Sequence, residues 1–77
     1  MNPIVYIIQD LHDYNFSSTE ITDFLSKIYI CFLKEIDLES YFSYLHNDKY
    51  RDAYYLFLDD IYELPMQYWI EWYNSLS

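Results

Sequence analysis

The chain has 77 residues, with thirteen acidic residues against four basic ones and a formal net charge of −9 at pH 7. This charge argues against direct binding to nucleic acid, whose phosphates would repel it, and against binding to anionic membranes. Aromatic residues make up 23% of the chain, so the composition also excludes a disordered chain that is too polar to pack. The length predicts a single domain over residues 1–77.

The N-terminal segment is predicted to be a helix. Asn2 followed by Pro3 is typical of an N-cap and a first helical turn. Apolar residues then recur at helical spacing: Ile4, Ile7, Ile8, Leu11 and Tyr14. The β-branched run over residues 4–8 would also suit a strand, but no second alternating segment is present to pair with it.

This first apolar run does not resemble a targeting or membrane segment. It is too short for a signal peptide, and no lysine or arginine precedes it. No stretch of the chain approaches the roughly 20 apolar residues that a membrane-spanning helix needs. We therefore expect a cytoplasmic protein.

A second helix, over about residues 18–36, has the clearest start. Ser17 and Glu20 form an S-x-x-E capping box, and Asp23 can pair with Lys27 one turn later. Its apolar stripe comprises Ile21, Phe24, Leu25, Ile28, Phe32 and Ile36. The only cysteine, Cys31, lies within this apolar segment and is expected to be a small buried side chain.

Three further short helices are expected. Asp37 can cap a third, and Asn47 is expected to end it in the left-handed conformation. Asp48 can cap a fourth, which continues until Pro65 ends it and begins the fifth. The predicted fold is therefore all-α, a compact bundle of four to five short helices.

No catalytic, metal or cofactor motif is evident. Asp10, His12 and Asp13 lie close in sequence, and Asp59 and Glu63 are four residues apart, but helical metal sites need Glu-x-x-His elements that this chain lacks. The chain has no glycine from which to build a phosphate-binding loop. We expect neither an enzyme nor a cofactor, and we interpret these groups as solvated helix surfaces.

The predicted fourth helix carries an acidic stripe opposite its apolar face. On a helical wheel its members fall within about 80° of one another, with Asp60 beside them: Asp48, Asp52, Tyr55, Asp59 and Glu63. Successive carboxylates would lie about 6–10 Å apart, compared with one phosphate per about 3.4 Å on a DNA strand. Such a row is commonly a solvated face. Its combination with tyrosine and a large net negative charge favours docking onto an arginine-rich surface.

The last helix is apolar around most of its circumference. One apolar stripe comprises Met66, Trp69, Ile70 and Tyr73. A second apolar stripe lies directly beside it and includes Tyr68 and Trp72. A surface helix of a monomer usually has a broader polar face. We therefore expect Tyr68 and Trp72 to contact a second copy of the chain or a target protein.

These features lead to three functional hypotheses. The absence of glycine and the scarcity of alanine and arginine indicate an AT-rich genome, such as that of a low-GC bacterium or its phage. Small acidic proteins of this kind are similar in character to phage anti-defence proteins, including anti-CRISPR and anti-restriction inhibitors that imitate DNA, although no aligned motif carries this likeness. The leading hypothesis is an inhibitor of a basic nucleic-acid-binding protein. The alternatives are an immunity protein or antitoxin that neutralises a basic nuclease, and an assembly subunit that folds with a partner.

Overall fold

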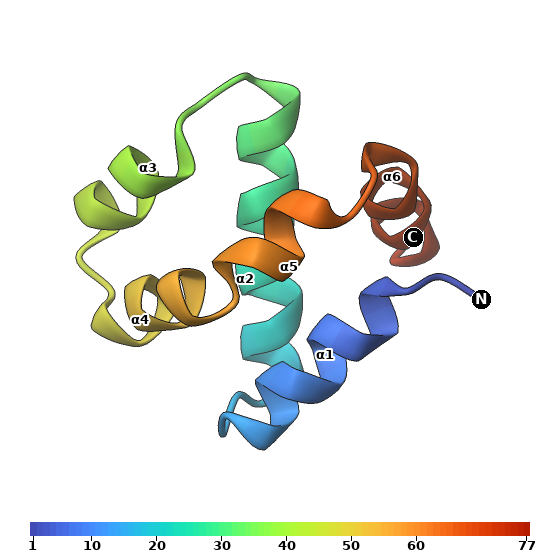
Figure 1. The fold of residues 1–77 in the computed structure, drawn as a ribbon, viewed down its shortest axis with the longest axis horizontal. Helices are drawn as coiled ribbons and strands as arrows, with labels where there is room; N and C mark the ends of the chain where they lie inside the picture. Colours follow the sequence, from blue (N-terminus) through green and yellow to red (C-terminus); the bar gives the residue numbers. More distant parts are fainter.

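The structure, a computed structural model, describes residues 1–77 and is all-α, as the sequence predicts (Figure 1). It contains six helices: α1 (Ile4–Asp13), α2 (Ser18–Leu33), α3 (Leu38–Leu45), α4 (Asp48–Leu56), α5 (Leu58–Glu63) and α6 (Met66–Ser75). The expected number of four or five is close. The additional helix arises because the segment predicted as one fourth helix is divided between α4 and α5. None of the six is long and apolar enough to cross a membrane.

The core surrounds α2, the longest helix, and α5 crosses in front of it (Figure 1). Eighteen buried side chains, all apolar, form one cluster to which every helix contributes. The largest fully buried side chain is that of Trp69 of α6. Cys31 is buried in this cluster, as predicted. Burial of each large apolar side chain contributes about 1.5–3 kcal/mol, so the cluster is the main source of stability.

The predicted starts of α2 and α3 are confirmed by their hydrogen bonds. Ser17 Oγ accepts from the Glu20 N–H at 3.1 Å, and Glu20 Oε1 accepts from the Ser17 N–H at 2.9 Å, which completes the capping box. Asp37 caps α3 by accepting from the Ser40 N–H at 2.9 Å. These contacts satisfy backbone donors that a helix start would otherwise leave without partners.

The chain makes its tight turns without glycine. Asn15, Glu35 and His46 all have positive φ angles, of 68°, 56° and 56°. After α2, the Ile36 N–H donates to the Cys31 carbonyl at 2.9 Å, the bond that closes a helix when the preceding residue is left-handed. A side chain at these positions costs free energy that glycine would not.

The end of α3 differs from the prediction by one residue. His46, not Asn47, takes the left-handed conformation. Asn47 is instead extended and caps α4, its Oδ1 accepting from the Tyr50 N–H at 3.0 Å. Because Asn47 rather than Asp48 caps α4, the left-handed residue that ends α3 is His46, one position before the predicted Asn47.

The prediction of one continuous helix from Asp48 to the segment before Pro65 is wrong. Phe57, with φ −105° and ψ 18°, ends α4 and precedes α5. The bend allows α4 to bury Ala53 and α5 to bury Ile61 in the same cluster while the two helices run in different directions (Figure 1). The acidic stripe is therefore divided between two helices and is not a straight row.

The last helix is rotated relative to the sequence expectation. Trp69 and Trp72 are both buried, whereas Ile70 is 41% exposed and Tyr73 is 36% exposed. Only 8% of Trp72 is exposed, so the single chain offers little of this ring for the predicted contact with a second copy or a target. Tyr68 is half-buried, and its backbone carbonyl accepts a 2.9 Å hydrogen bond from Asn2 Nδ2, which ties the N-terminal segment to α6.

Candidate functional site

Six of the eight residues predicted to contact a partner are exposed. Three lie on α4 and three on α5: Asp48, Asp52, Tyr55, Asp59, Asp60 and Glu63. Tyr55 is 48% exposed although its ring lies 5.2 Å from that of buried Tyr54. Tyr68 and Trp72 are the two that the fold withdraws from the surface.

The α4 acids differ from the α5 acids in their charge environment. Arg51 lies 3.3 Å from an Asp48 oxygen and 3.5 Å from an Asp52 oxygen, so one cation partly compensates both. No lysine or arginine pairs with Asp59, Asp60 or Glu63 of α5. The uncompensated part of the predicted stripe is therefore on α5.

Positive charge is segregated along the chain and in the fold. All four lysine and arginine residues lie between residues 27 and 51: Lys27, Lys34, Lys49 and Arg51. Helices α1, α5 and α6, the cation-free helices, contain six acids and neither lysine nor arginine: Asp10, Asp13, Asp59, Asp60, Glu63 and Glu71. Helices α1 and α6 pack against each other. The strongest uncompensated negative charge thus lies on this part of the molecule.

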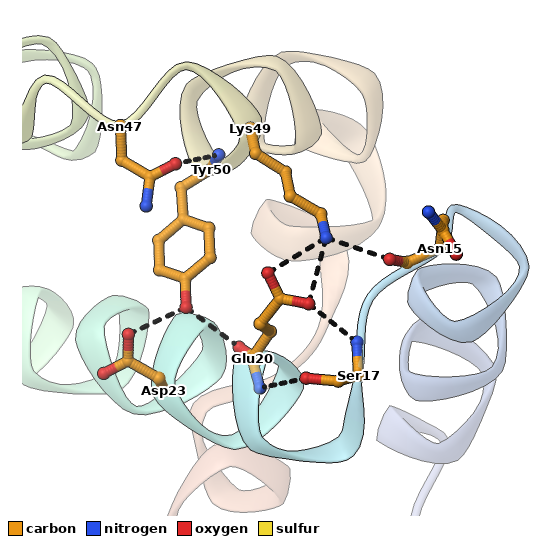
Figure 2. Close-up of polar contacts among 7 residues, drawn as sticks. All are labelled: Asn15, Ser17, Glu20, Asp23, Asn47, Lys49 and Tyr50. Carbon is orange, nitrogen blue, oxygen red and sulfur yellow. Dashed lines mark hydrogen bonds and ion pairs between the residues drawn. The ribbon is translucent and has the colours of Figure 1, made fainter.

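Lys49 of α4 is used within the fold (Figure 2). Its Nζ donates at 2.9 Å to both carboxylate oxygens of Glu20 and to the Asn15 carbonyl, and it lies 4.7 Å from the centre of the Phe16 ring. Lys27 likewise pairs with Asp23 at 2.7 Å, as the i, i+4 spacing predicts. With Arg51 also paired, three of the four cations are engaged inside the chain.

Next to Lys49, Tyr50 links α4 to α2 (Figure 2). Its hydroxyl donates to Asp23 Oδ2 at 2.8 Å and lies 3.4 Å from the Glu20 carbonyl. Burial and the hydrogen bond to Asp23 raise the pKa of Tyr50. Partial burial alone would raise the pKa of Asp23, but the hydrogen bonds from Lys27 and Tyr50 outweigh it and lower that pKa. These polar groups stabilise the fold and are not free to bind a partner.

A groove of ≈ 460 Å³ lies between α1 and the α5–α6 segment. It is lined by Pro3, Tyr6, Ile7, Asp10, Asp60, Glu63, Leu64 and Pro65. Its three carboxylates all belong to the cation-free helices, and we call it the acidic groove. Two of them were predicted contact residues. Asp10 and Tyr6 were not, because they are about fifty residues away in sequence and no local spacing connects them to α5.

The structure offers few groups for chemistry. No group of three or more His, Cys, Asp or Glu side chains is placed to hold a metal ion. Burial raises the pKa of the Cys31 thiol, which disfavours the nucleophilic thiolate form. The candidate site is therefore a charged binding surface centred on α5 and the acidic groove.

No protein-family model matches the chain, and comparison with curated proteins and with solved structures finds no significant match. The charge distribution and the shape of the surface are therefore the features from which a function can be inferred.

Proposed function

We propose that this chain is a small non-enzymatic inhibitor that occupies the nucleic-acid-binding surface of a basic protein in the cytoplasm. Its target would be a host defence effector of the CRISPR or restriction type, and its gene would belong to a phage or mobile element. In this proposal exposed carboxylates take the place of nucleic-acid phosphates at the lysine and arginine side chains of the target.

The observation that carries the proposal is the amount of uncompensated charge. Four acids, Glu20, Asp23, Asp48 and Asp52, lie within ion-pair distance of a cation, which leaves nine of the thirteen without one. A small domain needs a net charge of only about 2–8 in magnitude to stay dissolved. Excess like charge destabilises a compact fold but accelerates encounter with an oppositely charged partner. Six of these nine acids lie on α1, α5 and α6, and this uneven distribution supports a directional binding surface.

The competing functions predict different partners. An immunity protein or antitoxin would bind a nuclease that is toxic to its own host, whereas an assembly subunit would bind a structural protein. Both would require tight, specific binding, but only the inhibitor and the immunity protein would compete with nucleic acid. Competition with DNA or RNA is therefore the property that a test must measure.

The first experiment captures partners from a related host on the immobilised chain at low and at half-molar salt. A captured nucleic-acid-binding protein is then purified, and its affinity for DNA or RNA is measured with increasing amounts of the chain. We expect competitive displacement that weakens steeply with salt, because exposed charges are screened over about 8 Å at physiological ionic strength. Binding that leaves nucleic-acid affinity unchanged would overturn the inhibitor function.

A matched pair of charge reversals locates the contact. The α5 variant carries Asp59→Lys and Glu63→Lys. The control variant makes the same charge change near α3, with Glu35→Lys and Glu39→Lys. All four positions are exposed, so neither variant should lose its helical circular dichroism signal. We expect the α5 variant to lose inhibition and the control to retain most of it. Equal loss in both would show that only total charge matters.

A further inference from the structure

The acidic groove combines negative charge with apolar walls. Of its lining residues, Tyr6 is 63% exposed and Ile7 is only 3% exposed. Pro3 and Pro65, on the segments that precede α1 and α6, also line it. Because proline fixes its own φ angle, the backbone is restricted at both of these positions. The hydrogen bond from Asn2 to the Tyr68 carbonyl further fixes the α1 side relative to α6.

The groove carboxylates come from two different helices. Asp10 comes from α1, whereas Asp60 and Glu63 come from α5. They do not form a group that could hold a metal ion, and neither lysine nor arginine occurs on the helices that carry them. A ligand that satisfies them must be cationic and must present several donors at separate points. A flexible stem would cover the apolar walls.

An arginine side chain has these properties. Its planar guanidinium carries five N–H donors, stacks on aromatic rings and is more weakly hydrated than an ammonium group. Its methylene stem packs on apolar surface while the head remains near charge. A guanidinium over the Tyr6 ring would also gain a cation–π contact. Lysine offers the charge but neither the planar donor fork nor equal stacking.

We infer that the acidic groove receives an arginine side chain presented by the basic partner protein. A second copy of the chain is a poor occupant, because its only arginine, Arg51, is already within ion-pair distance of Asp48 and Asp52. Nucleic acid and anionic lipid are repelled by the same carboxylates. The inference rests on the proposed function and assigns a specific contact within it.

The test uses two defined probes, a hexa-arginine and a hexa-lysine peptide, with affinity measured by calorimetry. Backbone amide shifts in NMR titrations locate each peptide. We expect hexa-arginine to bind several-fold more tightly than hexa-lysine, with the largest shifts at residues of the groove. Equal affinity for both peptides, or shifts confined to other helices, would overturn the arginine assignment.

Two variants give the groove its own control. The groove variant removes the three groove charges by Asp10→Asn, Asp60→Asn and Glu63→Gln. The control variant removes three charges elsewhere by Asp13→Asn, Glu35→Gln and Glu39→Gln. The groove variant should lose hexa-arginine affinity on the order of tenfold, and the control much less. Equal losses would show that the acidic groove is not the arginine-binding site. They would not affect the inhibitor function, because that function is tested separately by competition with nucleic acid.

A tyrosine pair tests the stacking contact. Tyr6→Leu keeps apolar bulk but removes the aromatic face, and Tyr44→Leu is the control on a residue that is 82% exposed. Tyr6→Leu should reduce the preference for arginine over lysine to near unity, whereas Tyr44→Leu should preserve it. A preference that survives in Tyr6→Leu would show that Tyr6 does not receive the guanidinium.

Discussion

The Tyr50 hydroxyl of α4 donates a 2.8 Å hydrogen bond to the Asp23 carboxylate of α2, twenty-seven residues earlier in the chain. The same carboxylate accepts from Lys27 at 2.7 Å. Tyr50 is 5% exposed, so its hydroxyl would lose hydration without this partner. The contact therefore fixes the position of α4 on α2 and couples it to the ionisation of Asp23.

Tyr50→Phe should lower the free energy of unfolding by about 1.5–3 kcal/mol at neutral pH, the cost typical of a hydrogen bond to a charged group. The pKa of Asp23 is lowered from 3.8 in the folded protein, so this stabilisation is present above pH 3.8. It is lost as the pH falls through the folded pKa. Urea unfolding across this pH range should show the wild type and the variant converging in acid.

Tyr44→Phe is the control for this measurement, because Tyr44 is 82% exposed and its hydroxyl has no partner within the chain. It should leave stability within about 0.5 kcal/mol of the wild type at every pH. A difference between wild type and Tyr50→Phe that stays constant as the pH falls far below 3.8 would show that Asp23 ionisation is not coupled to this bond.

Local features of the fold could be predicted from the sequence, since the interacting residues lie three or four positions apart. The Ser17–Glu20 capping box and the Asp23–Lys27 pair are of this kind. The Tyr50–Asp23 bond could not be predicted, because it joins residues that are brought together only when α4 packs on α2. The acidic groove was missed for the same reason, although Asp60 and Glu63 were recognised individually.

Two other failures have a compositional cause. Without glycine, the sequence does not mark which residue adopts positive φ, so the turn at His46 was placed at Asn47. The last helix has apolar residues on nearly every side, so its periodicity could not distinguish buried Trp72 from exposed Ile70. In both cases several local conformations have similar free energies, and tertiary packing determines which one is adopted.

Glu35→Gly should raise stability by about 1 kcal/mol. Glu35 has a φ of 56°, where a side chain is strained and glycine is not. Glu71→Gly removes the same charge from the exposed surface of α6 and should cost about 1 kcal/mol, because glycine weakens a helix interior. Thermal unfolding of both variants should therefore move the Tm in opposite directions. A Tm that falls in both would contradict the assignment of strain to Glu35.

Trp72→Ala should destabilise the protein by about 3–5 kcal/mol, the usual cost of removing a buried aromatic ring. A domain of this length has only about 4–12 kcal/mol of total stability, so partial unfolding at room temperature is expected. Trp72→Phe should retain the fold with a smaller loss. Ile70→Ala, at a position that is 41% exposed, should cost much less. A Trp72→Ala protein that stays folded and fully stable, but has a lower assembled mass in sedimentation, would contradict this prediction. It would show that Trp72 contacts a second molecule.

Salt should act in opposite directions on the free protein and on its complex. Nine carboxylates without a cation partner repel one another in the folded state, and salt screens this repulsion. Raising sodium chloride to half-molar should therefore increase the Tm of the free chain by about 5 °C. The same change should weaken binding to a basic partner.

The Glu35→Lys and Glu39→Lys control described above also tests this prediction. Each substitution replaces a negative charge with a positive one, so the two together change the net charge from −9 to −5. Its Tm should respond less to salt than that of the wild type, because less repulsion remains to be screened. If the wild type and this variant gain equal stability from sodium chloride, the gain reflects general salt effects on apolar burial, and self-repulsion is not the cause.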